Sequence, residues 1–397
     1  MAEEKEVLLK VEHLCQYFKN VKAVDDVSFD IKKGEVFGLV GESGCGKTTT
    51  GRSIIKIYDI TSGNIYFKGQ RIGAGTKSYY DAIKAAKEEL RKGNPDASRR
   101  AELEKIIEDN KKEIQSAKFT KKNCDKIFAK SLVEKLTEQY EQDKAAAAGD
   151  SAKLAELKKK YDADVRVAKK SKLVTKIQMI FQDPIASPNP RMTVREIISE
   201  GLIIRGIKDK EYIDNRVYDI LERVGLVREH AGRYPHEFSG GQRQRIGIAR
   251  SIVMEPDMLI ADEPVSALDV SIQAQVINLL NDLRNELGLT ILFIAHDLSV
   301  VKYFSDRIGV MYYGHMVELA DSDELFRHPI HPYTRSLLSA IPLPDPHFEK
   351  QRVRIVYNPI ADHDYSEQGP TFREILPGHF VSCNDAEEAK YREEFGL

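Results

Sequence analysis

The segment GESGCGKT, residues 41–48, is the feature that most constrains how this chain can fold. It follows the apolar run VFGLV, residues 36–40, and leads into TTTGRSII. That order predicts a buried strand, a glycine-rich turn and a helix, which is the context that a phosphate-binding loop requires. A coincidental glycine turn would not need both flanking elements.

The residue types in this segment suit a triphosphate, which carries several charges in a small volume. Glycines let the backbone curl with its N–H groups pointing inward, and a helix N-terminus adds positive potential. Lys47 supplies a mobile positive charge, and Thr48 offers a hydroxyl to Mg²⁺. The glycines are Gly41, Gly44 and Gly46.

The length and net charge of the chain limit the classes of protein to which it can belong. The 397 residues suffice for two domains or one elaborated domain. The formal net charge of −2 argues against a dedicated nucleic-acid binder. That average conceals a split, because residues 73–172 carry a net charge of +7 and the rest of the chain −9. The basic segment is therefore a separate compositional unit.

Hydropathy and cysteine usage indicate a cytosolic protein. No run of about 18 apolar residues is present, and the start MAEEKEVLLK lacks the apolar stretch of a secretory signal. The four cysteines form no Cys-x-x-Cys pair, so neither a disulfide framework nor a zinc site is expected. Cys45, inside the glycine-rich loop, is either a reactive thiol or only a small residue that fits.

The N-terminal half divides into strands and a helical insert. Residues 7–40 alternate short apolar runs with polar breaks and predict antiparallel strands, and residues 64–68 predict one more. From 73 to 172 the chain is rich in Lys, Glu and Ala, with narrow apolar stripes at helical spacing. Breaks at 93–95 and 149–150 divide this segment into three or four helices, which suit a helical hairpin or small bundle.

Globular composition resumes after residue 172. Helical patterns fill 194–230. Residues 258–261 and 290–294 are apolar strands, separated by the helix-like VSIQAQVINLLNDLRNEL. Strands without a polar face imply a parallel sheet that is covered on both sides.

Two strand ends carry groups suited to nucleotide hydrolysis. Asp262 and Glu263 follow the apolar strand 258–261. Asp262 can hold Mg²⁺ through water, and Glu263 can orient or deprotonate an attacking water. His296 ends the next strand, where it can contact the terminal phosphate.

Two further segments narrow the class of ATPase. Gln182, in IFQDP, offers an uncharged amide oxygen to the metal or the attacking water. FSGGQ, residues 238–242, is a second glycine turn that opens a helix but lacks a lysine. It could therefore present Ser239 and backbone N–H groups to a phosphate that another chain holds.

With these motifs in this order, the chain resembles an ABC-type ATPase. GESGCGKT corresponds to Walker A, Gln182 to the Q-loop, FSGGQ to the signature, LIADE to Walker B, SALD to the D-loop and His296 to the switch histidine. Phe18 matches the aromatic residue that stacks on adenine, with Tyr17 as the alternative register. The resemblance assigns ATP contacts to Phe18, Gly41, Glu42, Ser43, Gly44, Cys45, Gly46, Lys47, Thr48 and Thr49, and in trans to Ser239, Gly240, Gly241, Gln242 and Asp269. It assigns catalysis to Glu263, His296 and Gln182, and Mg²⁺ to Thr48, Gln182 and Asp262.

Outside 73–172, the chain is further similar to ATP-binding subunits of oligopeptide/dipeptide importers. VKAVDDVSFDI, EPVSALDVSIQAQVINLL and HPYTRSLLSAIPLPDP carry this resemblance, and GRSII and NPRMTV favour the F-type over the D-type subunit. It implies an α/β P-loop fold with a RecA-like core, an antiparallel β subdomain and a helical signature subdomain. The expected domains are the ATPase at 7–72 and 173–325, the charged helical insertion at 73–172 and an importer-type C-terminal extension at 326–397. Family members frequently hold an iron–sulfur centre with a cysteine cluster in the tail, but here the tail has only Cys383, so no cluster is expected.

The resemblance also implies partners and a location. Two cassettes would close head to tail on two ATP molecules, beneath two permease subunits at the cytoplasmic face of the membrane. The second ATPase subunit is expected to be different, and an extracellular solute-binding protein would act indirectly. Residues 185–200 would transmit motion to the permeases. The cargo, whether peptide, nickel or another small solute, stays open.

Two questions remain at the level of sequence. A soluble mechanical ATPase associated with nucleic acid is the alternative function, although its insert normally follows the Q-loop and is far longer. The insert at 73–172 is either a solvated outgrowth or a contact surface for anionic lipid headgroups, the partner ATPase or the binding protein.

Overall fold

The computed structural model describes residues 6–93, 95–147, 151–183, 189–341 and 354–396. The chain forms two compact units. Unit 1 comprises residues 1–69 and 260–397, and unit 2 comprises residues 70–259. Each unit is described by itself.

An antiparallel sheet begins unit 1. Its strands follow the order β2-β1-β4, with Leu9 opposite Phe67 across the β1–β4 pair. Apolar side chains on one face of each strand are buried, as the alternating pattern predicts. The strands are β1 (Val7–Phe18), β2 (Val21–Lys32) and β4 (Ser62–Phe67).

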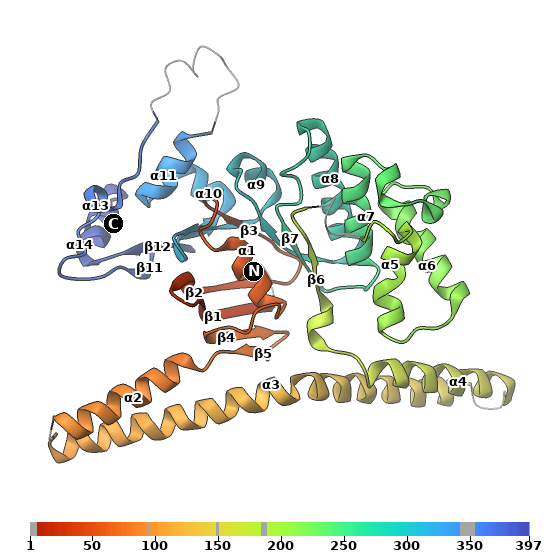
Figure 1. Cartoon of the computed structure of the whole chain (residues 1–397), viewed down its shortest axis with the longest axis horizontal. Coiled ribbons are helices and arrows are strands. Elements are labelled where there is room, and N and C mark those ends of the chain that lie inside the picture. Colours follow the sequence, from red (N-terminus) through yellow and green to blue (C-terminus); the bar gives the residue numbers. More distant parts are fainter. Residues whose placement is uncertain (1–5, 94, 148–150, 184–188, 342–353, 397) are drawn as a thin grey trace, which may run out of the picture. The chain divides into compact units, whose positions relative to one another are not determined.

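A larger mixed sheet forms the core of unit 1. Its strands follow the order β11-β12-β10-β9-β3-β8-β7, and β3 pairs in parallel with both β8 and β9 (Figure 1). The prediction of antiparallel strands throughout residues 7–40 is therefore wrong for 36–40, since this wholly buried strand joins the parallel sheet instead. The strands are β3 (Val36–Val40), β7 (Met258–Asp262), β8 (Thr290–Ile294), β9 (Arg307–Tyr312), β10 (His315–Asp321), β11 (Thr371–Leu376) and β12 (His379–Cys383).

The helices of unit 1 pack on these sheets. Helix α1 contacts β1 and β2 of the antiparallel sheet and β8 of the larger sheet, so it lies between the two. Helix α8 has the bounds that its sequence pattern predicts and ends at Gly288, whose φ is 64°. The helices are α1 (Lys47–Ile54), α8 (Val270–Leu287), α9 (Leu298–Phe304), α10 (Ser322–Arg327), α11 (Pro332–Ser339), α13 (Pro359–Asp362) and α14 (Asp385–Glu394).

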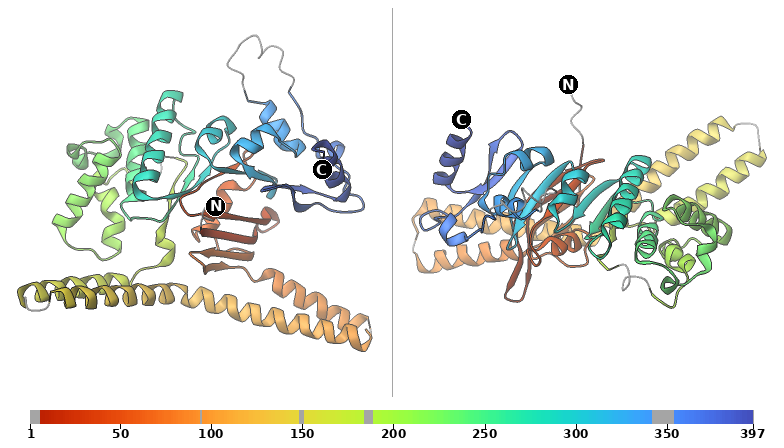
Figure 2. Two further views of the ribbon diagram at one scale, coloured as in Figure 1. Left: turned by 180° about the vertical axis from the view of Figure 1, so that it is seen from behind. Right: turned by 90° about the horizontal axis from the view of Figure 1, so that it is seen from above.

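Unit 2 contains the charged helices. Helix α2 (Lys77–Lys92) packs along the first part of α3 (Ala97–Ala146), and α4 (Ser151–Ala168) packs along its last part (Figures 1 and 2). The predicted hairpin is therefore two hairpins that share one 50-residue helix. The predicted helix break at 149–150 lies outside the described residues.

The long helix α3 changes partners along its length. Leu103, Ile114, Ala117 and Cys124 are buried on one face. Between the hairpins, β5 (Gln70–Ala74) crosses α3, where the Gln70 amide donates to the Cys124 carbonyl at 2.8 Å. Ile127 belongs to the predicted apolar stripe, but the residue is 48% exposed.

The rest of unit 2 is mainly helical, as predicted for 194–230. Thr193 and Glu196 form a capping box at the start of α5, which fixes where that helix begins. The elements are η1 (Leu173–Lys176), β6 (Ile177–Ile180), α5 (Val194–Ile204), α6 (Lys210–Arg223), η2 (Arg228–Gly232), η3 (Pro235–Glu237) and α7 (Gly240–Ile252). Among the described residues of either unit, we find no helix with the length and apolar content needed to cross a bilayer.

Candidate functional site

The glycine-rich loop connects β3 to α1 and depends on glycine at defined positions. Gly41, Gly44 and Gly46 have φ values of 147°, 83° and 106°, which side-chain-bearing residues rarely adopt. A Cβ atom on Gly41 would lie 2.2 Å from the Met311 carbonyl oxygen, and one on Gly46 would lie 2.3 Å from the Ala23 carbonyl oxygen. The loop therefore lies tightly against β9 and β2, as a preformed phosphate-binding loop requires.

Lys47 places its charge inside the curve of the loop. Its ammonium donates to the carbonyl oxygens of Gly41, at 2.8 Å, and Glu42, at 2.9 Å, and the side chain is almost fully buried. An ammonium has three donors, so it can also bind a phosphate oxygen that enters the loop. The backbone N–H of Gly314 donates to the Cys45 carbonyl at 3.0 Å and fixes the middle of the loop.

Thr48 and Asp262 meet at the end of β7. The Thr48 hydroxyl donates to Asp262 Oδ1 at 2.7 Å, and the carboxylate is fully buried. Burial raises the pKa of Asp262, against the lowering effect of the Thr48 hydrogen bond and of Arg52. Its Oδ2 atom has no hydrogen-bond partner among the described residues. A buried carboxylate oxygen without a partner, beside a hydroxyl, fits a hard divalent cation such as Mg²⁺.

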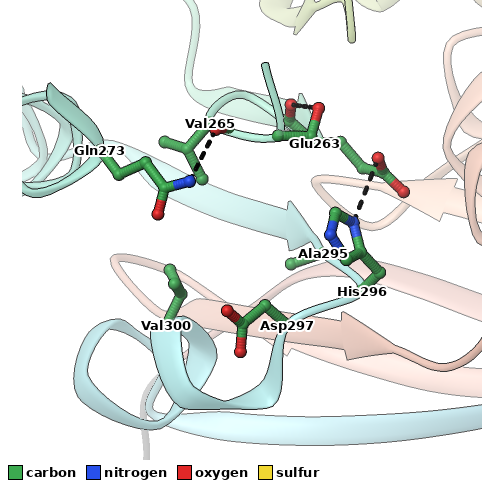
Figure 3. A pocket seen from close by; sticks show the side chains of 8 residues that line it. Glu263, Val265, Gln273, Ala295, His296, Asp297 and Val300 are labelled. Carbon is green, nitrogen blue, oxygen red and sulfur yellow. Dashed lines mark hydrogen bonds and ion pairs between the residues drawn. The ribbon is translucent and has the colours of Figure 1, made fainter. Parts of the chain in front are cut away.

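Glu263 and His296 face each other across the ends of β7 and β8. Figure 3 shows His296 Nδ1 pointing to Glu263 Oε2, at 3.3 Å. The Glu263 backbone has the unusual φ of 46°, and its N–H donates to the Ile294 carbonyl at 2.9 Å. This bond connects the two strand ends, so the parallel sheet brings together two residues that the sequence separates by 33 positions.

The pair borders a pocket with apolar and polar walls (Figure 3). The Gln273 amide donates to the Val265 carbonyl at 3.2 Å, and the Ser266 hydroxyl donates to the Glu263 carbonyl at 3.1 Å. These bonds hold the segment after Glu263 in place. The lining residues are Glu263, Val265, Ser266, Gln273, Ala295, His296, Asp297 and Val300.

The structure distinguishes the two candidate adenine contacts. The Tyr17 hydroxyl donates to Asp25, and burial raises the pKa of Tyr17. Phe18 is 40% exposed and packs edge-on against Tyr58, with ring centroids 5.0 Å apart. Phe18 therefore presents the more accessible ring, which favours it over Tyr17 as a stacking residue.

The remaining predicted contacts lie elsewhere. Gln182 and the signature segment belong to unit 2, so their contribution to the loop in unit 1 stays a prediction. Ser239 caps α7, because its hydroxyl accepts from Gln242 N–H at 3.3 Å while the Gln242 side chain accepts from Ser239 N–H at 3.1 Å. Asp269 is exposed at the start of α8, and its side chain makes no capping bond there.

Sequence reasoning missed one residue at the loop. The Tyr333 hydroxyl accepts a hydrogen bond from the Glu42 N–H at 3.0 Å. Tyr333 lies 291 positions away in HPYTRSLL, which sequence analysis used only as a mark of resemblance. No local pattern indicates such a contact.

Comparisons with known proteins agree with this geometry. The family described as ABC transporter matches residues 24–149 and 130–266, and the oligopeptide/dipeptide transporter C-terminal region matches residues 317–374. The oligopeptide transport ATP-binding protein OppF of Bacillus subtilis is 48% identical over 387 residues, which cover 96% of this chain and 98% of that protein. The dipeptide transport ATP-binding protein DppF of Lactococcus lactis is 43% identical, covering 94% of this chain and 90% of its own. The chain belongs to the peptide-transport branch of the ABC ATP-binding proteins.

Solved structures show the same fold for this ABC protein. CbiO1 of Clostridium perfringens, part of an ABC transporter complex, superposes with a TM-score of 0.52 at 22% identity, covering 82% of this chain and 92% of its own. The ADP conformation of the ATP-binding cassette MJ1267 superposes with a TM-score of 0.51, covering 81% and 96%. The predicted α/β P-loop cassette and the resemblance to F-type subunits are thereby confirmed. The protein is an ABC-type ATPase, and the nucleic-acid-associated alternative gains no support from these relatives.

Proposed function

We propose that this ABC ATPase drives import of oligopeptides or dipeptides at the cytoplasmic face of a membrane. The observation that carries the proposal is that Thr48, Asp262, Glu263 and His296 meet at adjacent strand ends beside the loop that holds Lys47. The names of the relatives and the matched C-terminal region support a peptide cargo.

Each residue of this cluster has a distinct role in ATP hydrolysis. The loop N–H groups and Lys47 bind the β- and γ-phosphates. Glu263 accepts a proton from the attacking water, and His296 holds the Glu263 carboxylate and contacts the terminal phosphate. Thr48 and Asp262, with Gln182, would hold Mg²⁺, which neutralises charge on the phosphates when bound.

The site needs a second cassette. The signature residues Ser239 to Gln242 start a helix, so their N–H groups can bind a phosphate, but no lysine accompanies them. We infer that they complete the ATP site of a partner cassette, with Asp269, and that a different ATPase subunit supplies the same segment here. Two permeases and, indirectly, an extracellular solute-binding protein complete the complex, and residues 185–200 contact a permease. Residues 185–188 of this segment lie outside the described residues.

The decisive experiment replaces Glu263 by Gln in the assembled transporter. Removing a general base costs about 10²- to 10⁴-fold in rate, while the amide keeps the shape of the side chain. We expect kcat for ATP hydrolysis to fall by that factor, with ATP still bound and the two cassettes closed. Glu367→Gln, which neutralises an exposed carboxylate of the C-terminal region, is the matched control and should leave kcat unchanged. Wild-type turnover by Glu263→Gln would show that Glu263 is not the base.

We infer domain boundaries of 7–72 with 173–325 for the ATPase, 73–172 for the helical insertion and 326–397 for the C-terminal extension. The helices of the insertion begin at Lys77, after β5, which supports a boundary near the end of that strand. The match of the transporter C-terminal region at 317–374 supports the last domain.

We also propose that the insertion contacts anionic lipid headgroups. The exposed surface of α3 carries several lysines and Phe119, which is 60% exposed. Two of these lysines pair with acids on the same helix, Lys112 with Glu108 at 2.8 Å and Lys130 with Glu134 at 3.7 Å. Clustered lysines attract anionic lipid with about 1 kcal/mol each. The lysines are Lys111, Lys112, Lys118, Lys122, Lys126 and Lys130.

Vesicle flotation tests this contact. We expect the triple Lys→Glu variant at 118, 122 and 126 to lose binding to phosphatidylglycerol vesicles, because the exposed surface of α3 becomes acidic. The matched control carries the same Lys→Glu change at Lys19, Lys33 and Lys208, which lie outside the insertion, and should retain binding to the vesicles. Equal binding by the wild type and both variants would leave α3 as a solvated outgrowth.

A further inference from the structure

Tyr333 lies in the C-terminal region and reaches the phosphate loop. It is the second residue of α11, its side chain is 2% exposed, and its hydroxyl accepts from the Glu42 N–H at 3.0 Å. Burial raises the pKa of Tyr333, so the hydroxyl keeps its proton near neutral pH.

The hydrogen bond reaches one particular peptide unit. The N–H of Glu42 and the carbonyl of Gly41 belong to the same planar peptide group, whose two ends cannot turn independently. Its carbonyl oxygen accepts from Lys47 Nζ at 2.8 Å, while its N–H donates to Tyr333. A change at the Tyr333 hydroxyl therefore alters the orientation of the group that holds the Lys47 ammonium.

Tyr333 is itself held by a buried hydrogen-bond network. His331 caps α11, because its Nδ1 accepts from the Tyr333 N–H at 3.1 Å. The fully buried carboxylate of Glu318 accepts from the N–H groups of Ile330, at 2.8 Å, and His331, at 3.1 Å. His379, the first residue of β12, lies 2.7 Å from the same carboxylate. A continuous chain of bonds thus connects β12 with the phosphate loop.

Aromatic packing fixes the ring independently of the hydroxyl. The Tyr333 ring lies 4.5 Å from that of Tyr312 and 5.5 Å from that of Tyr357, measured between centroids. Replacement by phenylalanine keeps these contacts and removes only the oxygen that accepts from Glu42. The packing role and the loop role of Tyr333 can therefore be separated by one substitution.

We propose that Tyr333 is a positioning residue for nucleotide binding, which orients Lys47 through the Gly41–Glu42 peptide and so makes phosphate affinity depend on the C-terminal region. This inference rests on the proposed function of the loop as an ATP site. Tyr333 acts through Lys47 and touches no phosphate itself.

The test measures nucleotide affinity of the full-length Tyr333→Phe variant with ATP and with AMP. Because Lys47 serves the β- and γ-phosphates, we expect the ATP dissociation constant to rise about three- to tenfold and that of AMP to stay unchanged. The matched control is Tyr357→Phe, which removes a hydroxyl from the same aromatic cluster without touching the loop. We expect it to bind both nucleotides as the wild type does. A urea unfolding midpoint equal to that of the wild type shows that Tyr333→Phe is folded.

Three outcomes would overturn the inference. These are unchanged ATP affinity in Tyr333→Phe, an equal loss for ATP and AMP, and an equal loss in Tyr357→Phe. Failure of the wild type itself to bind ATP would instead refute the proposed function of the loop.

Discussion

Replacing Asp262 by Asn should change stability and nucleotide binding in opposite directions. The carboxylate is fully buried, its Oδ2 has no partner among the described residues, and burial raises its pKa. A buried polar group without a partner costs about 1–3 kcal/mol, and more when it is charged. Nearby Lys47 and Arg52 offset part of that cost. In Asp262→Asn the amide oxygen still accepts from Thr48 and the amide nitrogen takes the place of Oδ2, so the substitution removes only the buried charge. Because an unpartnered charged group costs more than a neutral one, we expect the nucleotide-free protein to gain about 1 kcal/mol at pH 8.

The gain in free energy of unfolding of Asp262→Asn over the wild type should depend on pH. A carboxyl group whose pKa is raised on folding destabilises the native state above that pKa, and the destabilisation disappears as pH falls through it. The stability difference between Asp262→Asn and the wild type should therefore stay constant above the raised pKa of Asp262 and shrink as the pH falls through it towards the ordinary pKa of an aspartate.

With MgATP bound, we expect the wild type to be more stable than Asp262→Asn, which is the reverse of their order without nucleotide. A ligand at 100 times its dissociation constant stabilises the native state by about 2.7 kcal/mol. If the amide lowers MgATP affinity at least tenfold, Asp262→Asn loses about 1.4 kcal/mol or more of that stabilisation. Urea unfolding at pH 8, with and without MgATP, measures both effects. Asp81→Asn, at an exposed position on α2, is the matched control and should change neither quantity.

Two results would refute this reasoning. If Asp262→Asn is less stable than the wild type without nucleotide, the buried charge is better compensated than the structure indicates. If MgATP stabilises both proteins equally, Asp262 does not help to hold the metal.

Three further predictions concern the loop and the C-terminal region. Gly46→Ala should abolish measurable ATP binding in a filter assay, because its Cβ would lie 2.3 Å from the Ala23 carbonyl at a φ of 106°, and retained affinity would contradict this. Burial lowers the pKa of His331 to about 3, so the unfolded chain binds more protons than the native protein between about pH 6.5 and 3. The free energy of unfolding therefore decreases as the pH is lowered through this range. His331→Asn keeps a capping oxygen but cannot bind the proton. When the pH is lowered from 7 to 5, its free energy of unfolding, measured with urea, should therefore decrease by about 2 kcal/mol less than that of the wild type; an equal decrease would refute this. The thiol of Cys45 is buried with a raised pKa, so an alkylating reagent should modify it more slowly than Cys15, and faster labelling of Cys45 would show an accessible thiolate.

Local patterns in the sequence were sufficient for much of the fold. The helix at 270–287 and the strand at 290–294 have their predicted bounds, since periodicity and the terminal Gly288 act within a few residues. The strand at 36–40 was also predicted, but not its parallel pairing with β8 and β9. Pairing depends on strands more than 200 positions away, which a local pattern does not contain.

The insert shows a similar division. Helical spacing predicted helices there, and the composition predicted their charged, exposed surfaces. The single helix α3 and its two successive partners depend on packing against α2, β5 and α4. The exposure of Ile127 departs from its place in the predicted apolar stripe.

The sequence by itself determined which chemical groups this protein brings to ATP, because each motif is local: the glycine loop with its lysine occupies 41–48, and the strand-end acids stand together at 262–263. Only the tertiary structure decided how they meet. It pairs Glu263 with His296 through a sheet edge, leaves Asp262 Oδ2 without a partner among the described residues, and brings Tyr333 to the Glu42 N–H. Hydrogen bonds and burial between distant segments arise from the folded backbone, and residue spacing carries no record of them.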